Sequence, residues 1–406
     1  MSGTAHNRKA ADKHGRHIIC FALITALCLI GDSMLYIVLP LYYKEAGLNS
    51  LWEVGAILAA NRIVRLPLNP LVGRLYTVVS ERNGIIAAVV LSTAATTVYG
   101  LAPSFPVWIA ARCLWGAAWT LLRLGSLFCI LKLSGPDNRG RYTGLYNGIY
   151  RLGSLVGMLF GGIIADAAGP GSTALSFGAV TALAIFPALF LIPANLPDAD
   201  TGTVRAGAGT RARFRTFVRM LTTSGATAAG GLTALVIQGI LAPTLSLLIA
   251  AHTGGGVFLA GTLIGAASLG GIFQALRWAW EPWLAPLVGK FSDKRGRSRL
   301  LYRAFAAGGL LAAVLAAPLP LPVWFACLLG MQLAATALTT LTDAAAADAA
   351  ARSGGPSLLV AYTFAADAGM ALGPVLAFGM NEFLDINAVY LFSAGLFLLF
   401  FLRRNA

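Results

Sequence analysis

Six arginines stand inside long apolar stretches of the sequence, where a charge is costly. On insertion scales an arginine at the centre of a lipid bilayer costs about 2.5 to 3.5 kcal/mol, so such residues are expected to face water or a partner. Their chemistry suits anions, because a planar guanidinium can donate two parallel hydrogen bonds to a carboxylate or a phosphate. The six residues are Arg62, Arg65, Arg112, Arg123, Arg151 and Arg277.

Four carboxylates lie in similar apolar surroundings, and the charges divide unevenly along the chain. The first half holds five of the arginines with Asp32, whereas the second half holds Arg277 with three acids. Arg277 and Glu281 are four residues apart, a spacing that places both on one helix face and predicts a local ion pair. The four carboxylates are Asp32, Glu281, Asp343 and Asp367.

These charges predict a binding site for a small anionic or zwitterionic solute. We expect Arg62, Arg65 and Arg151 to bind its carboxylate or phosphate groups. The alternative is that Asp32 and the arginines form a closed charge network that only fixes helix packing, and that the neighbouring polar residues make packing hydrogen bonds. Uncharged polar residues at similar depth that are candidates to line the site are Tyr36, Asn147, Tyr150 and Tyr362.

Two of the carboxylates are candidates for carrying protons. A carboxylate that is partly shielded from water can take up and release a proton near neutral pH. Asp32 in the first half and Asp367 in the second are the candidates. Asp367 also stands at the position that matches Arg151 when the two halves are compared at a fixed offset, so we expect these two residues at similar depth on opposite halves.

No pattern in the sequence indicates an enzyme or a metal site. The chain has no HExxH, GxSxG or phosphate-binding loop, and its histidines lie in the polar leader or at a helix end. The cysteines lie in or beside apolar stretches without a CxxC spacing, which is typical of small buried side chains. We therefore expect no cofactor, no metal and no nucleic-acid partner.

The composition indicates that lipid surrounds most of the chain. Of 406 residues 57% are apolar and only 11% are charged, more apolar surface than one soluble core could bury. A helix of about 20 apolar residues crosses a bilayer, and we predict an all-α membrane protein of twelve transmembrane helices. The predicted spans are 18–41, 51–76, 84–102, 106–132, 141–167, 173–194, 223–250, 257–289, 299–317, 321–348, 357–380 and 385–403.

The positive charges predict the orientation of these helices. Nearly all lysines and arginines outside the spans fall on one side, and the opposite loops carry only Lys44. Because positive loops stay in the cytoplasm, both termini are expected there, in a bacterial-type inner membrane. Residues 1–17 form a basic cytoplasmic leader, and the first span is too long to be a cleaved signal peptide. Residues 195–222 are expected to be a cytoplasmic linker between two halves.

The two halves, 18–194 and 223–406, resemble each other at an offset of 216 residues. The sequence PLVG occurs at 70–73 and 286–289, and PVW occurs at 106–108 and 322–324. Gly153 and Gly157 align in the same way with Gly369 and Gly373. The repeat predicts two pseudo-symmetric six-helix bundles with a solute site between them near the middle of the membrane.

A loop in the second half carries a family resemblance. The sequence GKFSDKRGRSR at 289–299 resembles the cytoplasmic loop motif of the major facilitator superfamily, and it lies between the eighth and ninth spans as that motif does. The resemblance implies a gating role for four of its residues, Gly289, Asp293, Gly296 and Arg297. The corresponding loop of the first half, 73–84, is stretched and lacks the aspartate.

Two further segments resemble motifs of the same family. IAARCLWGAA at 109–118 is similar to its second motif, with Trp115 in place of a glutamine, and this similarity implies that Arg112 tunes a proton site. GSLVGMLFGG at 153–162 resembles the motif of proton-driven exporters, with Met158 in place of the proline. The segments 31–40 and 61–70 look similar to exporters of opine-type metallophores, which are carboxylate-rich chelators.

Together these features predict a major facilitator fold and a secondary active transporter. We expect proton-coupled efflux of the solute by alternating access, with protons and the lipid bilayer as its other partners and a monomer as the working unit. The rival transporters are a multidrug exporter and an importer of organic anions. A rival of another class is a membrane sensor or membrane enzyme that has lost transport, which no catalytic constellation in the sequence supports.

Overall fold

The structure is a computed structural model that describes residues 2–101, 104–134, 138–193, 219, 224–259, 261–353 and 357–402. Almost all of this is helix, as expected for an all-α membrane protein. The predicted linker, 195–222, lies outside the described residues except for residue 219. The predicted basic leader is the beginning of the first helix, which runs without a break into the first apolar stretch.

The first half of the chain forms a group of helices that ends near residue 190. The fifth predicted span and the first part of the sixth lie in α5, where two helices meet at Gly169, which takes a non-helical φ of 82°, and Pro170 follows it without an N–H to donate. The rest of the sixth span includes the short helix α6. The helices of this half are α1 Ser2–Val38, α2 Leu51–Leu75, α3 Glu81–Tyr99, α4 Phe105–Leu133, α5 Arg139–Ala182 and α6 Ile185–Phe190.

The second half begins with a helix that is α-helical at both ends and π-helical in the middle. Its middle is a π-helical stretch, η1, between two α-helical segments. The elements of this half are α8 Gly225–Thr233, η1 Ala234–Leu241, α9 Ala242–Thr253, β1 Gly256–Leu259, β2 Thr262–Gly265, α10 Ala266–Arg295, α11 Arg297–Leu315, α12 Leu321–Ser353, α13 Ser357–Phe383 and α14 Ile386–Leu402.

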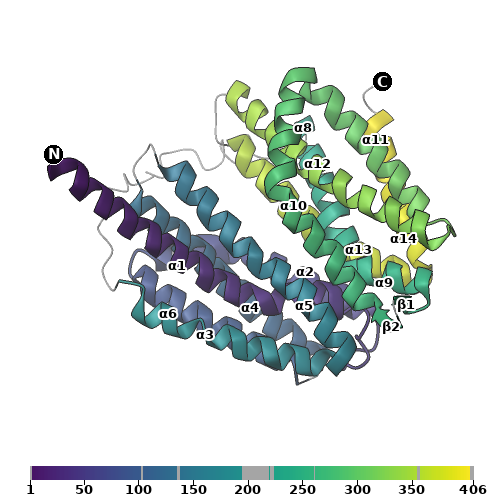
Figure 1. The fold of residues 1–406 in the computed structure, drawn as a ribbon, viewed down its shortest axis with the longest axis horizontal. Coiled ribbons are helices and arrows are strands. Elements are labelled where there is room, and N and C mark those ends of the chain that lie inside the picture. Colours follow the sequence, from purple (N-terminus) through teal and green to yellow (C-terminus); the bar gives the residue numbers. More distant parts are fainter. Residues whose placement is uncertain are drawn as a thin grey trace.

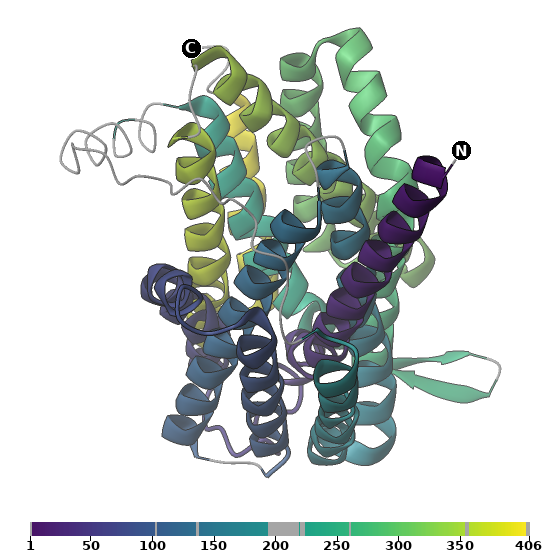
Figure 2. The ribbon, with the colours of Figure 1, turned by 90° about the vertical axis from the view of Figure 1, so that its left-hand side faces the viewer.

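The predicted start of the eighth span at residue 257 is wrong. Strands β1 and β2 pair there as an antiparallel hairpin, with Gly256 opposite Gly265, and Figure 2 shows the hairpin projecting away from the helices. Glycines impose this break, because Gly254 and Gly261 take φ values of 70° and 83°, which side chains rarely adopt. Helix α10 begins only at Ala266 and is still 30 residues long.

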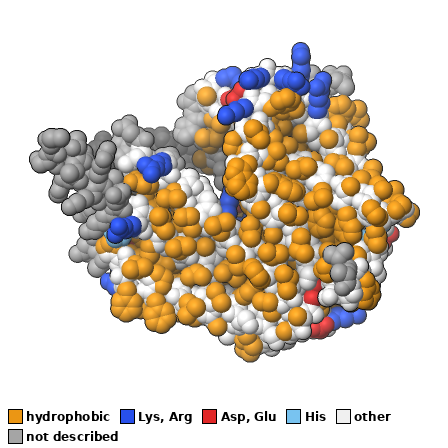
Figure 3. All heavy atoms as spheres, in the orientation of Figure 1, with side chains coloured by type: hydrophobic (Ala, Val, Ile, Leu, Met, Phe, Trp, Pro, Cys, Tyr) orange, Lys and Arg blue, Asp and Glu red, His pale blue; other side chains and the backbone are white. Residues whose placement is uncertain are grey.

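Seven helices among the described residues are long and apolar enough to cross a membrane, and α14 is a shorter apolar helix. Helices α2, α3 and α10 are not among the seven. Helices α2 and α10 carry arginines in their middle turns. Figure 3 shows apolar side chains over most of one face, with lysines and arginines gathered at one end. This surface fits a lipid environment, and the number of twelve spans stays a prediction.

The helices form two groups, α1–α6 and α8–α14, which lie side by side in Figure 1. Each group has an apolar core of its own, one of residues between Ile18 and Ile192 and one of residues between Ala229 and Phe397. Helix α5 packs against α10, and α2 packs against α13, across the boundary between the groups. These four helices therefore form the interface where a central site would lie.

The glycines of the predicted repeat have equivalent packing roles in the two groups. A Cβ atom at Gly153 or Gly157 of α5 would collide with the backbone of α1. A Cβ atom at Gly369 or Gly373 of α13 would collide in the same way with the backbone of α8 and η1. Close helix packing through small residues is a common device in membranes, and here it occurs at matching positions of both groups.

The two groups are joined at the end that carries the hairpin. The carboxylate of Asp166 on α5 accepts hydrogen bonds from the Tyr42 hydroxyl at 2.6 Å, and from the Ser268 amide and hydroxyl of α10 at 2.8 and 2.6 Å. Burial raises the pKa of the Tyr42 phenol, and the Asp166 carboxylate raises it further, so Tyr42 stays a donor. Ser246 adds a bond to the Ile37 carbonyl at 2.8 Å.

We expect Asp166→Ala to loosen this seal. A hydrogen bond to a charged group contributes about 1.5 to 3 kcal/mol, so losing these bonds should favour separation of the hairpin end by about tenfold or more. Spin labels attached to cysteines in place of the exposed residues Lys44 and Leu263 would report the change as a longer distance between the two labels in double electron–electron resonance. Asp385→Ala is the matched control, because Asp385 only caps α14 within its own group. An unchanged distance distribution would contradict the sealing role.

Candidate solute-binding site

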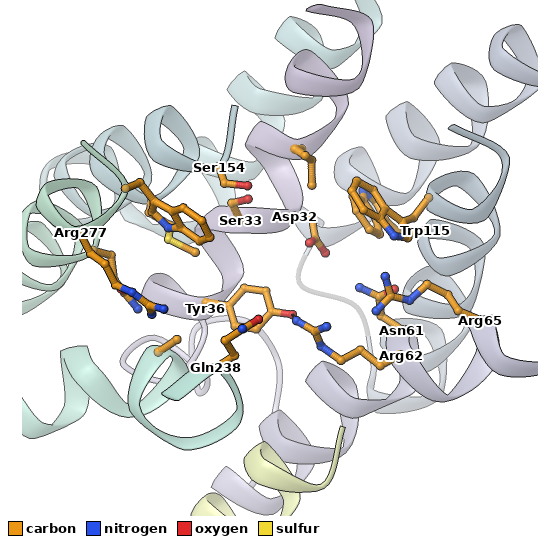
Figure 4. Close-up of a pocket in the computed structure, with 16 residues that line it drawn as sticks. Asp32, Ser33, Tyr36, Asn61, Arg62, Arg65, Trp115, Ser154, Gln238 and Arg277 are labelled. Carbon is orange, nitrogen blue, oxygen red and sulfur yellow. Dashed lines mark hydrogen bonds between the residues drawn. The ribbon is translucent and has the colours of Figure 1, made fainter. Parts of the chain in front are cut away.

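A cavity of about 170 Å³ lies between the two groups of helices. Figure 4 shows side chains from α1, α2, α4, η1 and α10 pointing into it. Its apolar walls include three tryptophans, Trp115, Trp119 and Trp278. The polar residues that line it are Asp32, Ser33, Tyr36, Asn61, Arg62, Arg65, Ser154, Gln238, Gln274 and Arg277.

Arg62 and Arg65 lie on the same face of α2 because they are three residues apart. The Arg62 guanidinium donates a hydrogen bond to the Tyr36 hydroxyl at 3.4 Å. Arg65 makes no hydrogen bond or ion pair with any residue that the structure describes, and its nearest electrostatic neighbours include Arg62 and Asp367. The two guanidiniums are half-buried, so this wall of the cavity can accept an anion.

Asp32 already has a cationic partner. Its carboxylate forms an ion pair with the guanidinium of Arg112, which is fully buried on α4. Arg112 also donates from Nε to the Ile57 carbonyl at 3.2 Å. The candidate proton-coupling residues Asp32 and Arg112 are thus brought together, and the Asp32 charge is compensated by Arg112 and not by Arg62 or Arg65.

The predicted ion pair between Arg277 and Glu281 is wrong. The Glu281 carboxylate accepts a hydrogen bond from the Arg151 guanidinium of α5 at 2.7 Å, which links the two groups of helices. Arg277 is only 3% exposed, its guanidinium lies 5.7 Å from the ring centre of Trp278, and it forms no ion pair with any residue in the described ranges. The i, i+4 spacing permits a local pair, but Glu281 faces the neighbouring helix that supplies Arg151.

Arg151 and Asn147 lie in a second cavity of about 330 Å³, between α5 and α10. Trp278 lines both cavities. Arg151 has 45% of its side chain exposed and lies over the same ring, at 5.4 Å from its centre. Asn147 accepts a hydrogen bond from Arg123 at 3.0 Å. These two candidates therefore flank the central cavity and do not line it.

Tyr150, Tyr362 and Asp367 do not line the central cavity either. The Tyr150 ring packs at 5.8 Å from that of Trp119, which does line it. Tyr362 donates a hydrogen bond to Asp343 within the second group. Asp367 on α13 has no hydrogen bond or ion pair in the described part of the chain and acts electrostatically on Arg65.

The loop motif ties together three helices of the second group. Gly289 and Asp293 lie on α10, and Gly296 ends that helix with a φ of 88° so that α11 can begin at once. Arg297 forms ion pairs with Asp293 and with Asp348 of α12, and it donates to the Ala344 carbonyl at 3.0 Å.

The first group contains an ion pair that the sequence analysis missed. Lys132 and Glu81 are 2.7 Å apart and join α4 to α3. At the repeat offset they correspond to Asp348 and Arg297, with the two signs exchanged. Comparing charges as well as identical residues at that offset would have found this pair. The first group thus keeps the link between neighbouring helices although its loop lacks the aspartate of the motif.

Gln274 and Arg277 on α10 and Gln238 on η1 complete the polar lining. The cavity therefore presents three guanidiniums, while its own carboxylate is already paired. Such an environment is suited to an anion with hydrogen-bonding groups. Among the described residues no group of His, Cys, Asp or Glu could hold a metal ion.

A central polar cavity between two groups of membrane helices is the architecture of a membrane transporter. The chain belongs to the Major Facilitator Superfamily, whose family model matches residues 21–282. This confirms the expected fold and a transporter in place of an enzyme.

Relatives of known role are distant. The staphyloferrin B transporter of Staphylococcus aureus is 24% identical over 274 residues, which are 66% of this chain and 63% of that protein. The efflux pump hmp6 of Hypomyces subiculosus is 24% identical over 149 residues, 37% of this chain and 26% of that protein. The matched segments thus span less than two thirds of these relatives.

Solved transporters share the fold over nearly the whole chain. A bacterial homologue of the lysosomal transporter Spinster, inward-facing and unoccupied, has a TM-score of 0.70 at 15% identity and 97% coverage of both chains. The nucleoside transporter NupG has a TM-score of 0.74 at 13% identity, covering 95% of this chain and 98% of that one. At these identities the likeness concerns the fold alone.

Proposed function

We propose that this protein exports a small anionic or zwitterionic solute in exchange for protons. The observation that carries the proposal is the pair of adjacent arginines, Arg62 and Arg65, which line the central cavity and form no ion pair with a carboxylate in the part of the chain that the structure describes. Two neighbouring cations in a partly dehydrated cavity repel each other, so an anionic solute would be stabilised there by both.

The direction of loading follows from the orientation that the positive loops predict. With both termini in the cytoplasm, the hairpin end lies outside, where Asp166 seals the two groups. The space-filling view in Figure 3 is hollowed between the groups towards the opposite end. A solute would then enter the cavity from the cytoplasm, as export requires. Rocking of the two groups about this site would expose it to the other side.

A carboxylate-rich metallophore is the solute class that we favour. The staphyloferrin B transporter and two efflux pumps are among the relatives, and the arginine-rich cavity suits a chelator with several carboxylates. A general multidrug exporter would be expected to present acidic groups to cationic drugs, whereas here the cavity carboxylate Asp32 is occupied by Arg112.

The test is untargeted mass spectrometry of cells and medium with and without the gene, in metal-replete and metal-starved cultures. Export predicts a compound that is retained in deletion cells and missing from their medium. A metal chelator would support the metallophore class, and another organic anion would support export alone. A compound left behind in the medium of deletion cells would show import and overturn the proposal.

Arg151→Gln is expected to slow transport about tenfold and to leave the protein folded. The Arg151–Glu281 pair is partly exposed, so its net contribution to stability should be about 0 to 1 kcal/mol. The loss in rate would come from removing a guanidinium that an arriving carboxylate can take over from Glu281. Initial rates in everted membrane vesicles, together with thermal unfolding of the purified protein, measure the two effects separately.

Glu281→Gln is the matched variant, because it breaks the same pair and leaves Arg151 free for the solute. It should retain transport at least as fast as the natural protein. Equal losses in both variants would indicate that the ion pair itself matters, and unchanged rates in Arg151→Gln would remove Arg151 from the proposed solute path.

A further inference from the structure

Arg277 and Gln274 form a polar pair on α10 with atoms that find no hydrogen-bond partner among the described residues. They are three residues apart and lie on one helix face, and they are 3% and 1% exposed. Arg277 Nε and Gln274 Oε1 are buried without a hydrogen bond in the described part of the chain. Both residues line the central cavity, so their unpaired groups lie at its wall.

A buried cation without a counter-ion destabilises the fold that contains it. The nearest acid along the helix, Glu281, is engaged by Arg151, and Asp32 is engaged by Arg112. Arg277 lies over the Trp278 ring, which fixes the direction of its planar guanidinium. The charge of Glu281 acts on Arg277 as well, but Arg151 repels it. An oriented guanidinium at a cavity wall whose neighbouring carboxylate is already paired is suited to bind an anion that the cavity receives from outside.

The place of Arg277 in the cavity is opposite that of Arg62 and Arg65. Figure 4 shows Arg277 on one side and the two α2 arginines on the other, with Tyr36 and Gln238 between them. The cavity thus has two cationic poles, Arg277 on one side and Arg62 with Arg65 on the other. They belong to different groups of helices, since α2 is in the first group and α10 is in the second. A solute with a single anionic group could neutralise only one of these two poles.

We propose that Arg277 and Gln274 form a second anion subsite, and that the solute carries two separated anionic groups, one for each pole. The inference rests on the proposed function and narrows its substrate class to compounds with acidic groups at both ends. Trp115 and Trp119 line the cavity as well, so the portion that joins the acids is apolar or flat. Such a solute connects the two groups of helices, which a monoanion cannot do.

The test uses the full-length protein purified in detergent, with simple carboxylates as probes. Thermal unfolding is followed with butyrate and with α,ω-dicarboxylates from succinate to azelate. We expect dicarboxylates of one range of lengths to bind more tightly than butyrate. Arg277→Gln should lower dicarboxylate affinity about 10- to 100-fold, the loss of one charged hydrogen-bonding group, and leave the butyrate response unchanged. Arg277→Lys, which keeps the charge, should restore part of the affinity.

Arg295→Gln is the matched control on the same helix. Arg295 stacks on Phe291 at 4.4 Å and does not line the cavity, so its removal should change neither response. Without ligand, Arg277→Gln should unfold at a higher temperature than the natural protein because a buried unpaired charge is gone. A purely structural role for Arg277 predicts the reverse.

The outcomes separate the two proposals. Dicarboxylate binding that is unchanged in Arg277→Gln, or a lower unfolding temperature of this variant without ligand, would overturn the second subsite and leave an anionic solute in place. A natural protein that no carboxylate stabilises would overturn the anionic solute and the subsite with it.

Discussion

Replacing both Arg62 and Arg65 by glutamine is expected to abolish export of the solute. Each guanidinium can make charge-assisted hydrogen bonds worth about 1.5 to 3 kcal/mol, and two of them together account for roughly 3 to 6 kcal/mol of binding. Since about 1.4 kcal/mol corresponds to a factor of ten, solute affinity should fall by roughly two to four powers of ten. Neither residue has an ion pair to lose among the described residues, so the protein should remain folded.

The single variants and a control on the same helix make this test specific. Arg62→Gln and Arg65→Gln should each retain measurable transport, and a combined loss that differs from the sum of the two would show that both arginines hold one acidic group. Arg74→Gln removes an exposed arginine at the end of α2 and should have no effect. Normal export by the double variant would exclude the arginine pair from solute binding.

Several residues of the central cavity could be predicted from the sequence because a charged side chain is costly in lipid. Arg62, Arg65 and Asp32 stand out in apolar stretches, and that cost implies a wet surface or a partner. The structure places all three at the cavity, together with Tyr36. The same reasoning does not distinguish a residue in the cavity from one beside it, because Asn147 and Arg151 stand at similar depth in the sequence and line the second cavity instead.

Ion-pair partners were not predictable from local spacing. The sequence offers Glu281 to Arg277 within one helical turn, yet Glu281 pairs with Arg151, 130 positions away. Asp32 and Arg112 likewise lie on different helices. The choice of partner depends on which helices adjoin and how each is rotated, and a single sequence without tertiary contacts does not contain that information directly.

The repeat was visible in glycines and prolines because backbone contacts tolerate little change. Gly153 and Gly369 occupy equivalent close contacts in the two groups, where any larger side chain would push helices apart. Ion pairs tolerate exchange, since Glu81–Lys132 and Arg297–Asp348 join equivalent helices with reversed signs. The hairpin at 256–265 was missed because its strands are as apolar as a transmembrane helix, although Gly254, Gly255 and Gly261 mark its turns.

Asp32→Asn is expected to destabilise the protein by about 3 to 5 kcal/mol, the usual result of removing one partner from a buried ion pair. The reason is that Arg112 is fully buried and would keep its charge without a counter-ion. The double variant Asp32→Asn with Arg112→Gln removes both charges and should recover much of this loss. Thermal unfolding of the purified variants measures both effects, and a double variant less stable than Asp32→Asn would contradict the pairing argument.

The same double variant tests Asp32 as the proton-coupling residue. If protonation of Asp32 releases Arg112 during the transport cycle, a folded protein without either charge should still exchange solute between the two sides of a membrane. It should no longer accumulate solute against a gradient when a pH difference is imposed on vesicles, because no group in the pair can carry the proton. Accumulation that persists would assign coupling to another carboxylate. Asp367→Asn is then the next variant to test. Asp367 has no ion-pair partner in the described part of the chain, so removing its charge should leave the stability of the protein almost unchanged.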